Sequence, residues 1–507
     1  MSNTPIKSIL IVGGGTAGWM AAAAIKRSVG PNAEVRLVES ADIGVVGVGE
    51  ATVPTIKDFN ALIDLDEAEF MRETRATLKL GIEFNGWGRK DSAYFHPFGT
   101  YGGGSTLGDF PGSYFAMREQ GRALSLEAYS ICAHAARRGR VGARSPDPRS
   151  PLSGLHTAYH FDSVLYGQYL RKVCARRDIE RIEGEIVEVV QRPEDGFIDH
   201  VVLKDGRTLK ADLFIDCTGF RGLLIEGALK AGYEDWSHWL PMNRAWAVPC
   251  AKVRAVDPYT SSTARDAGWQ WRIALQHRTG NGHVYCSDYV DDDAARETLL
   301  ANLDGEALAE PRPLRFVTGR RKALWDKNVV SLGLSSGFIE PLESTSIHLV
   351  QVGIFRLLQH WPDLAFSQTN TKAYNRRLVR EIEMVRDFVI LHYHATDRDD
   401  TPFWRYVRDM PIPDSLAERV ELFRDRGLMF QVGADEYFQP TSWLAVMYGQ
   451  GIVPRTHNPL YDYQNPEQVA AGLEQLRRGW AATAEALPTH EAYLKSHGMW
   501  AMDPVAA

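Results

Sequence analysis

A glycine-rich turn near the amino terminus, Gly13-Gly14-Gly15-Thr16-Ala17-Gly18, is the first candidate for chemistry. Glycine at positions 13 and 15 permits a tight turn and the close approach of a pyrophosphate, and Gly18 lets the following helix pack on the preceding strand. The amino terminus of that helix offers unpaired N–H groups to phosphate oxygens. Glu39 ends the next predicted strand, where its carboxylate can accept hydrogen bonds from ribose hydroxyls. The spacing predicts a dinucleotide site and is compatible with both NAD and FAD.

Two later segments, 211–221 and 328–337, repeat the design of an apolar strand that ends in a glycine turn. Their simplest interpretation is two more core strands with tight turns. A long ligand such as FAD, however, needs contacts for its ribityl and isoalloxazine parts beyond those for the adenosine half. Together with the first loop, the two segments therefore favour FAD.

The elements that must hold these residues begin with a strand–helix–strand unit over residues 8–39. It consists of a strand at Ile9–Val12, an alanine-rich helix to about Ser28 and a strand at Glu34–Glu39. Further strands are predicted at 182–190, 200–203 and 213–217, with Asp205-Gly206 as a hairpin turn. After Pro341 the sequence is mainly helical, with helices predicted at 347–360, 371–392 and 466–486.

The fold class expected from this order is α/β, with a Rossmann-like FAD-binding fold and an added, mainly helical substrate-side region. The FAD-binding module is placed at residues 1–350, interrupted by substrate-side segments at about 90–160 and 235–315. Residues 351–507 form a mainly helical region that completes the substrate site. The whole chain is expected to be one compact unit.

Composition narrows the function classes. The 507 residues are 44% hydrophobic and 24% charged, with a net charge of −7, so the chain can bury a large core and offers no basic surface for nucleic acid. The five cysteines are far apart, without the spacing of a metal site or a disulfide framework, which suits a reducing cytoplasm. Neither a secretion signal nor a membrane-spanning stretch is indicated.

Six segments resemble the flavin-dependent halogenases, specifically the tryptophan-halogenase branch, and the resemblance covers nearly the whole chain. The segments are GGGTAGWMAA (13–22), GVGEATVP (47–54), ATLKLGIEF (76–84), ADLFIDCTGFRGLLI (211–225), GWQWRIAL (268–275) and SGFIEPLESTSI (336–347). The resemblance implies an FAD-binding fold of the flavin monooxygenase type and electrophilic halogenation of a small aromatic compound. It also implies FAD as FADH2 from a separate NADH-dependent flavin reductase, oxygen as co-substrate, and chloride or bromide. We expect a monomer or homodimer without a metal.

In the family, reduced flavin and oxygen give a hydroperoxide that oxidises halide to hypohalous acid, which is then guided to a buried lysine. Lys79 occupies that position, and its ammonium group could polarise the acid by a hydrogen bond or form a haloamine. Glu343 matches the catalytic carboxylate, which accepts the ring proton or stabilises the cationic intermediate. Ser344 would position that carboxylate. A helix-start acid beside a capping serine is the structural alternative for this pair, and both interpretations can hold together.

The resemblance assigns halide binding to the backbone N–H groups of Thr345 and Ser346, at a helix amino terminus where an anion is favoured. The family pattern usually has glycine at position 346, which leaves the choice between chloride and bromide open. Trp269 and Trp271 alternate along a predicted strand, so both indoles share one face and would separate the flavin from the substrate. Family members commonly have proline where this chain has Ala274.

Further flavin contacts are expected from the segment Glu50–Pro54, which resembles a mobile strap, and from four residues beyond the glycine loop. These are Ala51, Val187, Leu334 and Ile347. On the substrate side, the stretch 431–445 is shorter than in tryptophan halogenases and lacks their tyrosine pair. Tyr437, Phe438 and Trp443 could line an aromatic pocket there. The predicted substrate is therefore an indole-like or other electron-rich ring, not free tryptophan.

Two other functions compete with halogenation. An FAD-dependent aromatic monooxygenase would use the same oxidant to hydroxylate the ring, and a non-catalytic flavoprotein would keep only the fold. The tryptophan barrier and the pair Lys79 and Glu343 argue against both.

Overall fold

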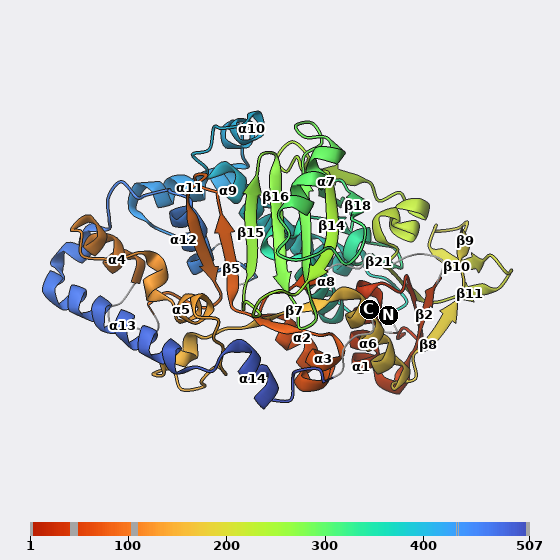
Figure 1. Cartoon of the computed structure of the whole chain (residues 1–507). Coiled ribbons are helices and arrows are strands. Elements are labelled where there is room, and N and C mark those ends of the chain that lie inside the picture. Colours follow the sequence, from red (N-terminus) through yellow and green to blue (C-terminus); the bar gives the residue numbers. More distant parts are fainter. Residues whose placement is uncertain (1–3, 41–48, 103–109, 432, 434, 503–507) are drawn as a thin grey trace. The chain divides into compact units, whose positions relative to one another are not determined.

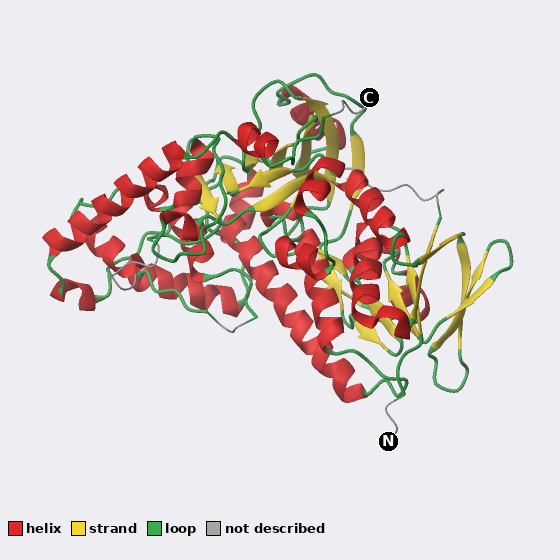
Figure 2. Cartoon of the chain, turned by 90° about the horizontal axis from the view of Figure 1, so that it is seen from below, coloured by secondary structure: helices red, strands yellow, loops and turns green. Residues whose placement is uncertain are grey.

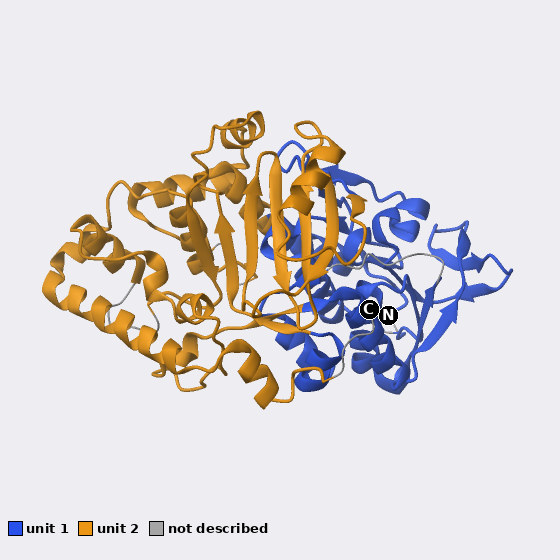
Figure 3. Cartoon of the chain, viewed as in Figure 1, with its two compact units in different colours: residues 1–75, 161–243, 315–383 blue, residues 76–160, 244–314, 384–507 orange. Residues whose placement is uncertain are grey.

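The computed structural model describes residues 4–40, 49–102, 110–431, 433 and 435–502, and the chain divides into two compact units (Figure 3). Unit 1 comprises Met1–Arg75, Phe161–Asn243 and Arg315–Glu383, and unit 2 comprises Ala76–His160, Arg244–Leu314 and Met384–Ala507. Each unit is thus assembled from three stretches of sequence. The predicted boundaries at 350 and 351 stay a prediction, and positions 47 and 48 of the strap motif lie outside the described residues.

Unit 1 is built on a six-stranded sheet. Its order is β20 (Trp325–Asp326), β21 (Val329–Ser331), β12 (Leu213–Asp216), β1 (Ser8–Val12), β2 (Glu34–Glu39) and β8 (Glu180–Glu183). The strands from β21 to β8 are parallel, and only β20 runs antiparallel. Because parallel strands have both faces covered, β1 and β12 are almost continuous apolar runs of buried residues.

Figure 2 shows the helices of the described residues in red, and six α-helices among them belong wholly or partly to unit 1. They are α1 (Thr16–Val29), α2 (Ile56–Leu62), α3 (Glu67–Glu73), α6 (Ser163–Ala175), α8 (Ser346–Gln359) and the first part of α9 (Gln368–His394). Helix α1 packs against α6 and α8, and its buried alanine run permits that close approach. The remaining strands are β3 (Gly49–Ala51), the sheet β9 (Ile186–Gln191), β10 (Ile198–Leu203) and β11 (Thr208–Lys210), and the sheet β13 (Tyr233–Asp235), β19 (Gly319–Arg321) and β22 (Gly337–Phe338).

Unit 2 is built on a seven-stranded sheet, much of which is labelled in Figure 1. Its order is β18 (Arg312–Arg315), β14 (Arg244–Ala251), β17 (Arg278–Tyr285), β16 (Gly268–Ala274), β15 (Thr260–Arg265), β5 (Gly81–Asn85) and β6 (Ala93–Pro97). The strand β4 (Thr77–Lys79) pairs antiparallel with residues of β7 (Ala158–Asp162).

Unit 2 also contains most of the described helices in the second half of the chain. Its helices are α4 (Phe110–Glu119), α5 (Ile131–Arg137), α7 (Asp292–Ala301), the second part of α9, α10 (Pro402–Asp409), α11 (Asp414–Arg426), α12 (Pro440–Gly449), α13 (Pro466–Ala486) and α14 (His490–Ser496). Among the described residues, no helix combines the length and the apolar character needed to cross a membrane.

The expected α/β fold is confirmed, and one strand prediction is wrong. Residues 182–190 do not form one strand: the chain breaks after Glu183, so that β8 joins the six-stranded sheet and β9 joins the sheet with β10 and β11. Gly184 lies at the break, where the chain leaves one sheet for the other. Because Glu183 and Ile186 both continue a strand-like pattern, periodicity alone does not reveal that change of sheet.

Candidate active site

The glycine loop leaves β1 and enters α1 within three residues. Gly13 has φ of 108°, which glycine adopts readily, and its N–H donates to Val38 O at 2.9 Å. A Cβ atom at Gly13 would collide with the carbonyl of Cys217, and one at Gly18 would collide with the carbonyl of Gly13. Both glycines are therefore required by close packing of the loop itself.

Gly15 differs from these two because its Cβ position is open, with no atom of the described chain within 4 Å. It is the N-cap of α1, and no side chain caps the first N–H groups of that helix. The open space and the uncapped helix terminus together fit a pyrophosphate, which needs both room and N–H donors. Gly14 faces the other way, and a Cβ atom there would collide with the Glu39 carboxylate.

Glu39 ends β2, as the sequence predicted, and its carboxylate is not isolated. Arg181 Nε donates to its Oε1 atom, and Arg171 Nη1 lies 3.9 Å from the same oxygen. A carboxylate has about four acceptor positions, so these contacts leave capacity for ribose hydroxyls.

The two later glycine turns lie at the same edge of the unit 1 sheet as the first. Strands β1, β12 and β21 are adjacent and parallel, so their carboxyl ends meet at one edge. The turns that follow β12 and β21 contain Gly219 and Gly333, each with φ of 69°. The short helices that contain these glycines contact each other. The three turns therefore lie side by side at one edge of the sheet, and together they offer the extended surface that a dinucleotide needs.

Asp216 organises the turn after β12. Its buried carboxylate accepts hydrogen bonds from the N–H groups of Thr218 at 3.0 Å, Leu224 at 2.8 Å and Ile225 at 2.9 Å. These bonds hold the start of the π-helix Leu223–Ala228 against the sheet. Leu334, in the neighbouring turn, is 36% exposed and so available for contact with a ligand.

The segment from Glu343 to Ser346 forms the start of α8. Glu343 and Ser344 are buried, and Ser344 adopts a left-handed conformation with φ of 61°, which costs energy for a residue with a side chain. Thr345 is the N-cap but makes no side-chain capping bond. Within the described part of the chain, its buried hydroxyl has no hydrogen-bond partner. A helix terminus with free donors and a spare hydroxyl suits an anion.

Polar side chains of α8 and the residue after the strap form a cluster that the sequence analysis missed. Thr55 Oγ1 lies 3.0 Å from His348 Nδ1 and donates to Gln351 Oε1 at 3.3 Å. Burial, with a smaller effect of Arg356, lowers the pKa of His348 to about 3, so the imidazole is neutral. Burial also raises the pKa of the Glu50 carboxyl in β3 to about 7. Histidine and glutamine four and seven residues after Ser344, on one helical face, were the available signal.

Lys79 ends β4 and is fully buried in unit 2. Its Nζ atom lies 5.2 Å from the centroid of the Phe98 ring, within the range of a cation–π contact. Its strand partner on β7 is Ala158, which is also fully buried. Phe98 was not singled out from the sequence, although it follows directly on the strand β6.

Trp269 and Trp271 lie on β16 in the seven-stranded sheet and are buried. Their ring centroids are 6.0 Å apart, and they share one face of the strand, as predicted. The partner of Trp271 on β17 is Gly282, where a Cβ atom would collide with the indole ring. The indole N–H of Trp271 has no partner among the described residues.

The three aromatic residues predicted for the substrate pocket belong to one packed cluster. Phe438 stacks on Phe388 with centroids 3.8 Å apart, and Tyr437 contacts Phe438 edge-to-face. Trp443 is buried, and its indole N–H donates to Glu436 Oε1 at 3.1 Å and to the carbonyl of Phe438 at 3.0 Å.

Arg419 completes that cluster. Its guanidinium lies 2.7 Å from Glu436 and 4.3 Å from the centroid of the Trp443 ring. Trp443 is therefore fixed from two sides. On the opposite side of the cluster, His96 of β6 contacts both Phe388 and Phe438.

The remaining predicted flavin contacts are in three different environments within unit 1. Ala51 is buried in β3 and Ile347 is buried in the first turn of α8. Val187 is 60% exposed on β9, in a different sheet from the three glycine turns. The contacts described above do not bring Val187 to those turns.

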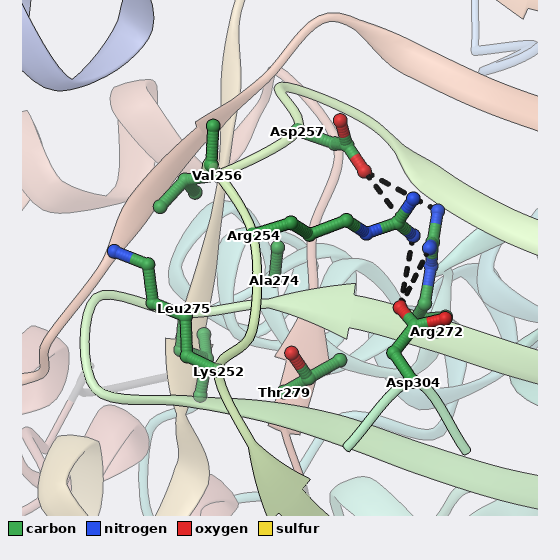
Figure 4. A pocket seen from close by; sticks show the side chains of 10 residues that line it. Lys252, Arg254, Val256, Asp257, Arg272, Ala274, Leu275, Thr279 and Asp304 are labelled. Carbon is green, nitrogen blue, oxygen red and sulfur yellow. Dashed lines mark hydrogen bonds and ion pairs between the residues drawn. The ribbon is translucent and has the colours of Figure 1, made fainter.

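A surface pocket in unit 2 lies behind the tryptophan strand (Figure 4). Arg272 and Ala274, which line it, alternate with Trp269 and Trp271 along β16 and so belong to the opposite face. In Figure 4 the side chains of two arginines and two aspartates converge, and their ion pairs measure 2.8 to 3.6 Å. These residues are Arg254, Arg272, Asp257 and Asp304. The charges of these four residues balance, and Lys252 is a further cationic residue of the pocket lining.

The parallel sheet with three glycine turns at one edge defines a nucleotide-binding protein with a Rossmann-type fold. A sequence model of the tryptophan halogenase family matches residues 8–466, and the chain belongs to that family. It is 33% identical to tryptophan 6-halogenase SttH of Streptomyces toxytricini, over 97% of this chain and 98% of the relative. It is 31% identical to tryptophan 7-halogenase RebH of Lentzea aerocolonigenes, over 97% and 99% of the two chains.

Solved structures agree with this assignment. The chain superimposes on Xcc4156, a flavin-dependent halogenase from Xanthomonas campestris, with a TM-score of 0.95 and 45% identity, over 99% of this chain and 100% of the other. For BrvH, a flavin-dependent halogenase from Brevundimonas sp. BAL3, the TM-score is 0.93 and the identity 43%, over 97% and 99%. The protein is thus an FADH2-dependent halogenase of aromatic compounds that uses a halide and oxygen, in a family that generally requires a separate flavin reductase.

Proposed function

We propose that this enzyme halogenates an indole-like, electron-rich ring, with the oxidised halogen presented by Lys79. The observation that carries this proposal is the complete burial of the Lys79 side chain beside the Phe98 ring. An ammonium group that is removed from water acts more strongly on a neighbouring oxidant than an exposed one does. In unit 2 it is held on a strand next to an aromatic surface, which is where an oxidant and an aromatic substrate would meet.

The residues of unit 1 fit FAD. Gly15 offers room and N–H donors for the pyrophosphate, and Glu39 offers acceptors for the ribose. The turns at Gly219 and Leu334 offer surface for the remaining part of the cofactor. When bound in reduced form, FAD supplies with oxygen the oxidation of halide to hypohalous acid.

The halide would be held at the start of α8 by the N–H groups of Thr345 and Ser346. The unpartnered hydroxyl of Thr345 and the absence of a side-chain cap support this role among the described residues. The left-handed backbone of Ser344 turns the chain between Glu343 and the halide donors. One short segment can therefore hold an anion and a carboxylate in fixed positions without a flexible linker.

Lys79 and Glu343 would divide the chemistry between them. The Lys79 ammonium donates a hydrogen bond to the oxidant or carries its halogen, and in either form directs the halogen to a ring carbon. Glu343 accepts the proton that the ring carbon loses, or stabilises the cation before that loss. Because both side chains are buried, each interaction acts in a medium of lower effective polarity than water.

Trp269 and Trp271 would keep the substrate away from the flavin. The aromatic ring of the substrate would then react with hypohalous acid and would not contact the flavin directly. Their bulk and burial support this barrier role. On the substrate side, Phe98, His96 and Phe438 provide aromatic surfaces in unit 2. Trp443, whose N–H is already bonded, would support that surface without touching the substrate.

SttH and RebH act on tryptophan according to their names, and we propose a different substrate for this chain. The stretch 431–445 lacks a tyrosine pair and an evident clamp for an amino acid's carboxylate and ammonium groups. We further propose that an NADH-dependent reductase supplies FADH2. A cytoplasmic location and a monomeric or homodimeric state stay predictions.

The test is a reaction of the purified protein with FAD, NADH, a flavin reductase, oxygen, bromide and indole. We expect a monobrominated indole, recognised in the mass spectrum by the paired isotope peaks of bromine. A parallel reaction with free tryptophan is expected to give less product. Omission of bromide and of the halogenase are the controls.

The products also separate the competing functions. Hydroxylated indole under these conditions would favour the aromatic monooxygenase. An absence of product across a panel of electron-rich aromatics, with both bromide and chloride, would favour the non-catalytic flavoprotein. More product from tryptophan than from indole would overturn the substrate assignment but not the reaction type.

A further inference from the structure

A buried histidine, His160 on β7, is the cross-strand partner of Thr77, two residues before Lys79. Side chains two residues apart on a strand point to the same face, and directly paired residues share that face. Thr77, Lys79, Ala158 and His160 therefore occupy one face of the β4–β7 pair. His160 is fully buried there, diagonally across from the lysine.

Both ring nitrogens of His160 are bonded to hydroxyl groups. Nδ1 lies 3.2 Å from Thr77 Oγ1, and Nε2 lies 2.9 Å from Thr260 Oγ1 on β15. The Thr77 hydroxyl in turn donates to the carbonyl of Ala274 on β16 at 2.7 Å. Three strands besides β7 thus contribute to one line of hydrogen bonds.

The direction of these hydrogen bonds determines which ring nitrogen of His160 carries the proton. Because the Thr77 hydroxyl gives its proton to Ala274, its oxygen accepts the Nδ1–H of His160. Nε2 then carries no proton and accepts the hydroxyl of Thr260. Burial, the charge of Lys79 and His490 all lower the pKa of His160 well below its usual value. The ring is therefore a fixed, neutral dipole, and it is not available as a general base.

A second histidine anchors the same strand from its backbone. The N–H of Leu78, between Thr77 and Lys79, donates to His490 Nε2 at 2.9 Å. His490 Nδ1 in turn lies 3.1 Å from the carbonyl of Val256, and burial lowers the pKa of this imidazole to about 4. The strand that carries Lys79 is thus held by two neutral histidines, one through a side chain and one through the main chain.

We propose that His160 is a positioning residue for Lys79: clamped between two threonine hydroxyls, its neutral ring fixes β4 and the direction of the ammonium group without placing a second charge beside it. The inference rests on the proposed role of Lys79. A positively charged side chain at position 160 would repel the ammonium group, and an apolar one would release Thr77 and Thr260. A displacement of about 1 Å in a catalytic group can lower a rate by about 100-fold.

The experiment compares His160→Leu, which removes both hydrogen bonds, with His160→Asn, whose amide can still donate to Thr77. Product from indole and bromide is measured per FADH2 oxidised, and free hypohalous acid is trapped with monochlorodimedone. We expect His160→Leu to lower brominated indole per FADH2 about tenfold and to raise the trapped acid, with the KM for indole within about twofold. His160→Asn is expected to restore part of the loss.

The matched control is His283→Leu. His283 is also a buried histidine on a strand of unit 2, with a pKa lowered to about 4 by burial, and its Nδ1 bonds to the carbonyl of Ala295. If loss of a buried histidine acts only through folding, both leucine variants lower the active fraction and neither changes product per FADH2. Equal ratios in the two variants would therefore overturn the inference.

A second pair of variants tests the hydrogen bonds between His160, Thr77 and Ala274 without altering the histidine. Thr77→Val removes the hydroxyl at nearly constant volume, and Thr77→Ser keeps it. We expect the valine variant to resemble His160→Leu and the serine variant to resemble the unaltered enzyme. Lys79→Ala is assayed alongside: normal bromination by that variant would overturn the proposed function, whereas its inactivity with a normal His160→Leu variant would overturn only this inference.

Discussion

The two candidate sites of the molecule are built in different ways. In unit 1 the nucleotide cradle is made by main-chain turns, and its decisive residues are glycines whose missing side chains leave room. In unit 2 the surroundings of Lys79 are made by side chains from β4, β7 and β15 and a main-chain carbonyl of β16, joined through hydroxyl and imidazole groups. The first arrangement depends on space, which is filled by neighbouring atoms at Gly13 and Gly18 and open at Gly15, whereas the second depends on charge and proton position. Substitutions in unit 1 should therefore act through lost space or collisions, and substitutions in unit 2 through changed charge or hydrogen bonding.

The largest expected effect comes from Lys79→Ala. Removal of the ammonium group should lower ring bromination by more than about 100-fold, because the oxidant loses the group that directs it. FADH2 oxidation should continue at nearly the normal rate, because the cradle in unit 1 is intact. Product and FADH2 are measured in one reaction, with the exposed Lys210→Ala on β11 as control. A variant that brominates indole normally would contradict the division of roles between the units.

Two glycine substitutions sharpen the comparison within unit 1. Gly15→Ala adds a methyl group in open space, so the apoprotein's melting temperature should stay within about 1 °C while the Kd for FAD rises about 10- to 100-fold. Gly18→Ala adds a methyl group against the Gly13 carbonyl and should lower the apoprotein's melting temperature itself. Calorimetry and fluorescence titration of FAD measure both. Unchanged FAD affinity in Gly15→Ala would place the pyrophosphate elsewhere.

The carboxyl group of Glu50 is expected to make the stability of unit 1 depend on pH. Its pKa is raised from 4.5 to about 7 by burial, so between these values the folded protein keeps a proton that the unfolded chain has lost. The free energy of unfolding should therefore fall as pH rises from about 4.5 to 7, by about 1 to 2 kcal/mol after allowance for partial exposure. Glu50→Gln should lack this slope in urea unfolding. Parallel curves for the two proteins would show that Glu50 titrates normally.

The smallest effect is expected at the halide segment. Ser346→Gly keeps the backbone donor and removes a hydroxymethyl group, so it should favour the larger ion, raising the ratio of brominated to chlorinated indole about two- to fivefold in mixed halide. That change corresponds to less than about 1 kcal/mol. Product ratios at equal halide concentrations measure it. Thr345→Ser, which keeps the hydroxyl, is the control and should leave the ratio unchanged.

The sequence predicted the strand–helix–strand unit over residues 8–39 well because its parts are local. Strand β2 has the predicted bounds, β1 begins one residue earlier than expected, and α1 ends at Val29 where Ser28 was expected. The glycines of the first loop and the strand and helix around them are within thirty residues of one another. The local sequence pattern is therefore enough to predict the local structure. The helix at Pro466–Ala486, with proline in its first turn and an asparagine cap, was also predicted to the residue.

The surroundings of Lys79 could not be predicted in this way. Thr77, His160 and Thr260 are 83 and 100 residues apart along the chain, and no local period connects them. A histidine inside the apolar run Ala158–Phe161 was the available signal, because a polar residue on a buried strand needs partners. Likewise, the break after Glu183 depends on which sheet each half joins, which is a property of the assembled unit.

The packing of Trp271 against Gly282 extends the proposed tryptophan barrier to a second strand. Position 282 is on β17, and its vacant side-chain volume is what the indole ring fills. An added methyl group at that position would displace the indole ring from the neighbouring strand. The proposed barrier would therefore respond to a substitution on the second strand, outside the two tryptophans.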